Sequence, residues 1–283
     1  MSQSAIPPPP AQTPELVLEA GRADSHYWRD LWRYRELFVF LTWRDLLVRY
    51  KQTAVGVAWA VIQPAMTTAV FCAFGYLLNL PTGGVPRPVL ILAAQLPWQF
   101  FAASLSSSSN SLVSNAHLIS KVYFPRLIVP VSAIAVSLVD FLITAVFLIV
   151  VMVVYRVVPD WHIVALPLFV LIALCAALGA GLWLTALNVK YRDFRFVLPF
   201  IVQFGFYISP VAFTSDIVPA QWRTLYALNP MVGVIDGFRW SLLGGRAPLD
   251  WTSVSLSVVL VLVLLGSGVW FFRRTEKSFA DVI

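Results

Sequence analysis

The sequence predicts an all-helical integral membrane protein with six transmembrane helices. An amphipathic interface helix precedes them, and two short re-entrant or periplasmic helices lie between the fifth and sixth spans. Of the 283 residues, 59% are hydrophobic and 12% are charged, whereas a soluble domain carries roughly 25% charged residues to solvate its surface. Runs of about 20 apolar residues recur, each long enough to cross a hydrocarbon core about 30 Å thick. Lipid is therefore the solvent for most of the surface.

The chain begins with segments that we expect not to span the membrane. Residues 1–24 are rich in Pro, Ala and Ser, which predicts a disordered tail, and they lack the layout of a signal peptide. In residues 25–52, aromatic and leucine side chains recur at helical spacing, with charged side chains on another face and at both ends. We predict an amphipathic helix at the membrane interface, followed by a transmembrane domain over residues 53–283.

The transmembrane domain contains six apolar runs. Between the last two, charged residues interrupt short apolar pieces, and Pro219 and the pair Asn229-Pro230 would break a helix. Two short helices between Pro219 and Leu243 fit this stretch better than another span. The predicted spans cover residues 56–79, 88–112, 127–155, 162–187, 196–213 and 252–272.

The positions of the basic residues predict the orientation. With the amphipathic helix inside, six spans place 15 of the 20 Lys and Arg residues on the cytoplasmic side and 5 outside. This asymmetry predicts that both termini are cytoplasmic. The basic residues lie near the ends of apolar runs and form no groove with aromatic residues, so the net charge of +6 does not indicate a nucleic-acid partner.

Motifs for catalysis are absent from the sequence. It has no GxxxxGK[ST] loop for nucleotide phosphates, no Gly-x-Ser-x-Gly elbow and no His-Glu-x-x-His pair. Cys72 and Cys175 lie in apolar runs, where we expect them to pack rather than to bind metal. We therefore expect no enzyme activity, no metal and no cofactor bound by this chain.

Two polar features lie inside the predicted spans. Asp140 is the one ionisable residue deep in a span, and a charge there costs at least ~3 kcal/mol. We expect it to bond hydroxyl groups or a neighbouring helix, with a direct role in transport as the alternative. The serine-rich run from Ser104 to Ser111 favours close helix packing over a second reading, the polar lining of a passage.

The cytoplasmic connection between the second and third spans carries more apolar residues than a plain turn requires. It runs from Asn115 to Arg126 and includes Ile119 and Val122. Lying parallel to the membrane, such a segment fits a groove on a cytoplasmic partner. The residues of this connection that we assign to the docking surface are Asn115, His117, Lys121, Tyr123 and Phe124.

An ordered set of short segments resembles a known family. Over about residues 27–283, the set resembles the type-2 ABC exporter permeases for O-antigen and teichoic acid, most of all the Wzm group. The order of the segments is specific, although each one alone is not. They are Arg49 to Trp59 with Gln63-Pro64, Leu118 to Arg126, Leu138 to Phe141, Asn188 to Asp193, Tyr207 to Val211 and Leu228 to Met231.

The resemblance implies a homodimeric permease of a bacterial inner membrane that works with two separate ATPase subunits. ATP and Mg²⁺ would be bound by those subunits, and the substrate would be a long glycan on undecaprenyl diphosphate. The amphipathic helix, with Arg44 and Tyr50, and the Asn115–Arg126 connection would contact the ATPase and together form the docking surface. The two short helices would form the outer gate.

Aromatic residues suit the passage of such a substrate, because sugars stack on rings through their apolar C–H faces. A stacked sugar can slide to the next ring without breaking a buried ion pair. The alternative for each ring is packing against helices or lipid. The residues assigned to the passage are Trp59, Phe71, Phe74 and Tyr76 of the first span and Phe204 and Tyr207 of the fifth.

Two other functions compete with glycan export. A type-2 permease for a drug or small lipid would share the same architecture. An intramembrane enzyme would need clustered acids or a basic and metal site at the membrane face. Asp193 beside Arg192 and Arg195 is the one candidate for such a site, and a lone carboxylate holds a divalent metal poorly.

Overall fold

The computed structural model describes residues 27–51, 56–191, 193–247, 249–277 and 279, so the predicted tail at residues 1–24 lies outside the described part. Every regular element within these ranges is helical, as the sequence predicts. The elements are α1 (Tyr27–Arg33), α2 (Arg35–Lys51), α3 (Gly56–Leu77), α4 (Arg87–Ser114), α5 (Ala116–Lys121), α6 (Ile128–Val154), η1 (Trp161–Ala165), α7 (Leu166–Lys190), α8 (Phe194–Ile208), η2 (Ser215–Ile217), α9 (Ala220–Tyr226), α10 (Pro230–Leu242) and α11 (Trp251–Glu276).

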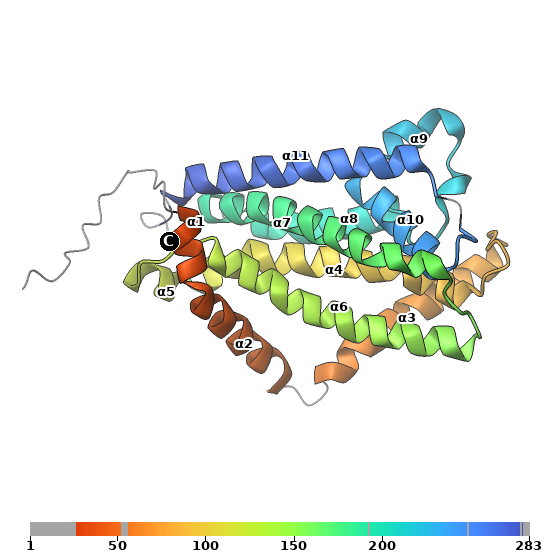
Figure 1. Cartoon of the computed structure of the whole chain (residues 1–283), viewed down its shortest axis with the longest axis horizontal. Helices are drawn as coiled ribbons and strands as arrows, with labels where there is room; N and C mark the ends of the chain where they lie inside the picture. The colour runs from red at the N-terminus through yellow and green to blue at the C-terminus, as the bar shows by residue number, and fades with distance from the viewer. Residues whose placement is uncertain (1–26, 52–55, 192, 248, 278, 280–283) are drawn as a thin grey trace, which may run out of the picture.

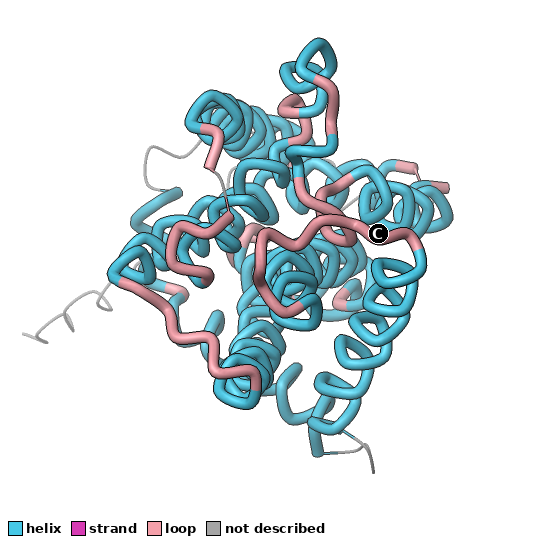
Figure 2. Tube along the Cα trace, turned by 90° about the vertical axis from the view of Figure 1, so that its right-hand side faces the viewer, coloured by secondary structure: helices cyan, strands magenta, loops and turns pink. Residues whose placement is uncertain are grey.

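The long helices run side by side along one axis of the molecule (Figure 1). Helix α4 is the most buried of them and packs against α3, α6, α7 and α10. Seen along the axis, loops connect the helices across the near end of the bundle (Figure 2). The N-terminal helix α1 and the C-terminal end of α11 lie at the same end of the bundle as α5 (Figure 1).

Five helical segments are long and apolar enough to cross a membrane. Each falls within a few residues of a predicted span, which confirms those five apolar runs as helices. They are Ala58–Leu77 in α3, Arg87–Ser114 in α4, Ile128–Val154 in α6, Trp161–Lys190 in η1 and α7, and Trp251–Glu276 in α11.

Helix α8 is shorter than the predicted span at residues 196–213. Its 15 residues, Phe194–Ile208, extend for about 22 Å at 1.5 Å per residue, less than the ~30 Å hydrocarbon core. The helix ends where Ser209 adopts an extended conformation with ψ 152°. Pro210 causes this, because the residue before a proline is disfavoured in the helical region. The predicted span was therefore too long at its C-terminal end.

Helix α10 is buried on most of its surface, between α4, α7 and α11. The Oδ1 atom of Asn229 caps it by accepting from the Met231 amide at 3.0 Å, and Pro230 occupies the first turn. Close packing on α7 requires Gly237, because an added Cβ would lie 2.1 Å from the Phe169 ring. Helix α10, in the segment between α8 and α11, is therefore part of the bundle core.

Three distant segments meet around Glu276, at the end of the bundle where α1 and α5 lie. Its carboxylate accepts from the Arg126 amide at 2.8 Å and from the Tyr27 hydroxyl at 3.1 Å. The Arg126 guanidinium in turn donates to the Glu276 carbonyl at 2.6 Å. The Arg273 guanidinium lies over the Tyr27 ring, 4.3 Å from its centroid. These contacts join α1, the segment before α6 and the end of α11.

Candidate functional site

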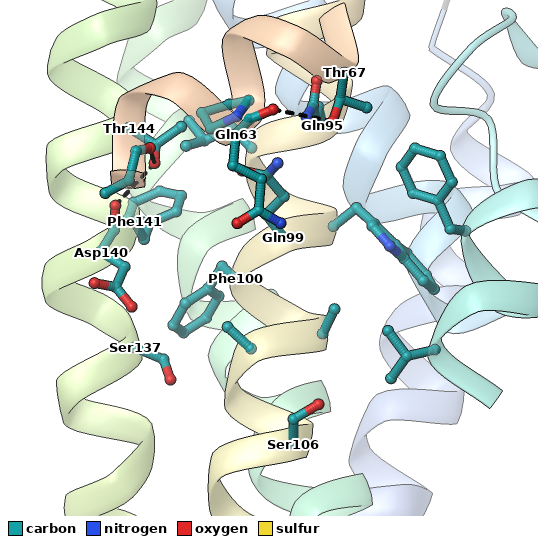
Figure 3. A pocket seen from close by; sticks show the side chains of 18 of the residues that line it. Gln63, Thr67, Gln95, Gln99, Phe100, Ser106, Ser137, Asp140, Phe141 and Thr144 are labelled. Atoms are coloured by element: carbon teal, nitrogen blue, oxygen red, sulfur yellow. Dashed lines mark hydrogen bonds between the residues drawn. The ribbon is translucent and has the colours of Figure 1, made fainter. Parts of the chain in front are cut away.

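A cavity of about 920 Å³ opens halfway along the bundle, between the end of α2 and helices α3, α4, α6 and α8. Its walls mix rings with polar side chains, several of which are drawn in Figure 3. The rings belong to Tyr50, Trp59, Trp98, Phe100, Phe141, Phe206 and Tyr207. The other polar side chains are Arg49, Gln63, Thr67, Gln95, Gln99, Ser106, Ser137, Asp140, Thr144 and Gln203.

Asp140 lies in the middle of α6 and bonds to the last turn of α2. The Arg49 Nη2 atom lies 2.6 Å from its Oδ2 atom, and the Tyr50 hydroxyl donates to its Oδ1 atom. Asp140 thus bonds a hydroxyl group and the neighbouring helix α2, the kind of contact expected for a structural role. A carboxylate at this depth needs such a compensating partner. The end of the α2 helix therefore forms part of the cavity wall.

The aromatic residues assigned to the passage divide into two groups. Trp59 and Tyr207 line the cavity, and Phe71 packs behind it, with its ring centroid 5.4 Å from that of Phe206. Three others lie elsewhere, and none of them lines the cavity. Phe204 stacks on Phe200, Tyr76 lies beneath the Arg87 guanidinium, and Phe74 is 52% exposed.

Helical spacing explains why Phe204 and Tyr207 separate. Residues three apart differ by about 60° around a helix, enough to turn Tyr207 to the cavity and Phe204 to the outer surface beside Phe200. Trp98, Phe206 and four glutamines of the cavity wall did not enter the sequence-based assignment. Their signal is present in the sequence, because glutamine inside an apolar span is uncommon and marks a functional or packing site.

The residues assigned to the docking surface also divide. His117, Lys121 and Tyr123 are exposed around α5. Arg44 and Asn115 bond to each other, with the Arg44 Nη2 atom 2.8 Å from the Asn115 Oδ1 atom.

Two of the assigned docking residues point into the protein. Tyr50 bonds Asp140, as described above, and Phe124 is 4% exposed in an apolar cluster with Leu41, Ile119 and Phe272. The sequence could not separate Phe124 from Tyr123, because a turn with no regular period decides which ring faces inward. Phe124 supports the α5 surface from beneath and does not form it.

The serine-rich run mainly joins α4 to α7. Thr185 Oγ1 donates to the Ser108 carbonyl at 2.8 Å, and the Asn188 amide donates to the Ser109 carbonyl at 2.9 Å. A Cβ at Gly181 would lie 2.8 Å from the Ser108 hydroxyl, so the backbones approach closely there. Of this run, Ser106 lines the cavity. The close-packing expectation describes most of the run, and the lining expectation describes Ser106.

A second charged cluster lies at the opposite end of the bundle from α1, where α10 packs against α4. Arg239 is 1% exposed and donates to the carbonyls of Leu90, Val211 and Phe213 at 3.3, 2.9 and 2.8 Å. Asp236 lies one turn earlier and accepts from the Ser215 hydroxyl. Burial raises the pKa of Asp236 to about 6, with the Arg239 guanidinium acting against that rise. The cluster binds the segment after α8 to α4 and α10.

A sequence model of the ABC-2 type transporter family matches residues 36–243, from the start of α2 to just past α10. The match covers well over half of the chain and includes every helix that lines the cavity. The chain belongs to the ABC-2 type transporter family.

Curated relatives of this ABC-2 protein span nearly its full length. The "O-antigen export system permease protein RfbA" of Myxococcus xanthus is 28% identical over 260 residues, 90% of this chain and 98% of the relative. The protein of the same name in Klebsiella pneumoniae is 26% identical over 249 residues, 88% of this chain and 95% of the relative. The "Polysialic acid transport protein KpsM" of Escherichia coli is 23% identical over 241 residues, 83% and 92% respectively.

In the ranges that the structure describes, no three His, Cys, Asp or Glu side chains gather where they could hold a metal ion. Asp193, the one candidate for an enzymatic metal site, is the residue before α8. The single carboxylate of the cavity wall, that of Asp140, is paired with Arg49.

Proposed function

We propose that this protein is the membrane subunit of an ATP-driven exporter of lipid-linked polysaccharide. The observation that carries the proposal is its similarity, over 83–90% of the chain, to relatives named for O-antigen export and polysialic acid transport. The cavity supports it, since rings and neutral amides suit a sugar chain better than an apolar drug. The substrate in this proposal is a glycan on undecaprenyl diphosphate.

The working unit in this proposal is a homodimer of the chain with two copies of an ABC ATPase subunit. ATP and Mg²⁺ bind to the ATPase, and this chain carries no cofactor. The exposed surface of α5, with His117, Lys121 and Tyr123, docks on the ATPase. The adjacent residues Tyr123 and Phe124 suit this role, because Phe124 is buried in the core while Tyr123 is 58% exposed.

The membrane topology in this proposal has six crossings, with α8 as the fifth. Five crossings would leave α1 and the end of α11 on opposite sides of the membrane, whereas the two lie together and are joined by the Tyr27–Glu276 hydrogen bond (Figure 1). The basic residues favour that end as the cytoplasmic one, in the bacterial inner membrane. Helices α9 and α10 then lie toward the outside and act as the gate.

The passage in this proposal runs along the cavity, with Trp59 and Tyr207 as its stacking surfaces. Of the other rings, Phe71 supports the wall through Phe206. Phe74, Tyr76 and Phe204 are assigned to the membrane-facing or dimer-facing surface instead, since they lie away from the cavity.

Deletion of the gene from its host and complementation test the proposed function. The deletion strain should lose surface polysaccharide and accumulate it inside the cell, and the plasmid-borne gene should restore it. Replacement of Tyr123 by Ala should leave the protein folded but uncouple ATP hydrolysis from export, measured on purified complexes. Unchanged surface glycan in the deletion strain would refute the export of polysaccharide, and normal coupling in Tyr123→Ala would refute the docking surface.

A further inference from the structure

Four glutamines converge on the central cavity from three helices. Of the five glutamines in the described ranges, Gln63 of α3, Gln95 and Gln99 of α4 and Gln203 of α8 line this cavity, and Gln221 lies apart on α9. Gln95 and Gln99 are four residues apart and so share one face of α4. Figure 3 shows the Gln63, Gln95 and Gln99 side chains together between α3 and α4.

Gln95 is the buried member of this group. Its side chain is 1% exposed, and its Oε1 atom accepts from the Thr68 hydroxyl at 3.0 Å. Its Nε2 amide, which carries two donors, has no hydrogen-bond partner among the described residues. A buried donor left without an acceptor is costly, and more so at membrane depth where lipid offers none. The amide therefore requires an acceptor that enters the cavity.

The other three amides are free to bind as well. Within the described part of the chain, no hydrogen bond holds the side-chain amides of Gln63, Gln99 and Gln203. Each amide offers two donors and an acceptor. The four together present matched donors and acceptors, a pattern that suits hydroxyl groups, which both donate and accept.

The charge and shape of the cavity further restrict the chemical class of the ligand. Its carboxylate, Asp140, is paired with Arg49, so neither charge is left to select an ionic group. Trp59 and Tyr207 add flat rings to the same walls. Its volume of about 920 Å³ falls within the range of about 300–1,000 Å³ typical of small-ligand sites. Neutral hydroxyls beside flat apolar faces describe a sugar ring and not a diphosphate.

We propose that Gln63, Gln95, Gln99 and Gln203 form a mid-membrane binding subsite for the hydroxyl groups of neutral sugar residues in the transported glycan. This inference rests on the proposed function and adds to it where, and by which chemistry, the chain is held. The diphosphate end of the substrate is bound elsewhere, because no unpaired basic side chain lines this cavity.

Methionine substitutions test the subsite, because methionine keeps the length and bulk of glutamine but removes the amide. Gln99→Met and Gln95→Met, in the full transporter, should each lower surface glycan at least fivefold at equal protein level and equal ATPase assembly. Leu262→Met, at a position of α11 that is 60% exposed and outside the cavity, is the control and should export normally. Failure of the wild-type gene to restore glycan would refute the proposed function. Normal export in both cavity variants, with wild-type complementation intact, would overturn only the subsite.

Photo-crosslinking separates sugar contact from a general defect in transport. A benzophenone side chain at Thr67, which lines the cavity, should form an adduct with glycan in exporting cells, detected with an antibody against the glycan. The same side chain at Val146, 61% exposed on α6 and outside the cavity, should form none. The Thr67 adduct should fall at least fivefold when Gln99→Met is added. An adduct that is absent in exporting wild-type cells, or unaffected by Gln99→Met, would overturn the subsite.

Discussion

The two charged clusters of the bundle are built in opposite ways. Arg239 is completely enclosed, and its guanidinium reaches three backbone carbonyls of two other segments as well as Asp236, at 4.0 Å. The Arg49–Asp140 pair instead lies on a cavity wall, with side chains 43% and 17% exposed, and joins a helix outside the predicted spans to the centre of α6.

This difference in burial determines which structural role each cluster can have. Each of the three guanidinium nitrogens of Arg239 donates a hydrogen bond to a buried carbonyl, so the side chain holds its segments in one arrangement. A pair that faces a cavity can exchange its partner for water, so breaking it costs less than removing a fully buried charge. The Arg239 cluster is therefore a fixed structural support, called the brace below. The Arg49–Asp140 pair, called the inner pair below, is a contact that can open when α2 moves.

The largest effect is expected at the brace. Arg239→Met leaves the Asp236 carboxyl and three carbonyls buried without their partner, which should destabilise the protein by about 3–5 kcal/mol. Thermal unfolding of the purified protein in detergent measures this loss. Arg246→Met, at an exposed position of the same region, is the control. A wild-type melting temperature for Arg239→Met would show that the Arg239 cluster does not stabilise the fold.

The pH dependence of stability should be second in size. The pKa of Asp236 in the fold, about 6, lies above its ordinary value of 3.8, so the folded state binds this proton more readily than the unfolded state. The stabilisation is therefore complete below about pH 4 and is lost as the pH rises toward 6, by up to about 3 kcal/mol. Melting curves at pH 4 and 6 should differ less for Asp236→Asn than for the wild type. Equal pH dependence in the two proteins would contradict this assignment.

A smaller effect on stability is expected at the inner pair. Asp140→Asn keeps the shape of the side chain and its contact with Tyr50, and the exposed Arg49 head can turn to water. The loss in stability should stay near 1 kcal/mol or less, while export falls because α2 is no longer held at the cavity. Melting temperature and surface glycan are measured on the same variant. Unfolding as severe as in Arg239→Met would show that the two clusters do not differ in kind.

The smallest effect is expected for Tyr50→Phe. It removes one hydroxyl donor to Asp140 and leaves the Arg49 ion pair in place, a change of about 1 kcal/mol or less. Export should be reduced less than in Asp140→Asn. Stronger loss in Tyr50→Phe would assign the α2 contact to the hydroxyl rather than to the ion pair.

The sequence predicted best those features that a single segment determines by itself. The five long helices follow apolar runs of about 20 residues, a property that the bilayer imposes on each segment alone. The shorter α8 could have been predicted from Pro210, whose effect on Ser209 is local. These features need no knowledge of the neighbouring helices.

The site depends on which helices meet, and there the sequence was less informative. It indicated that Asp140 needs a partner but not that Arg49 and Tyr50, about 90 residues away, provide it. Arg239 was counted among the outside charges, because nothing local marks it as enclosed. The passage assignment favoured rings over amides, and so it selected Phe204, which faces outward, ahead of Gln95 and Gln99.

The contacts around Glu276 have a consequence for the biogenesis of the protein. Tyr27 is among the first described residues to leave the ribosome, and its hydroxyl bonds a side chain 249 positions later. Chains emerge at about 5–20 residues per second, so α1 waits for roughly 12–50 seconds before its partner exists. During that interval the first helix is exposed to the membrane surface and to chaperones. The end of the bundle on which α1 and α5 lie is therefore completed only when the last helix has been inserted.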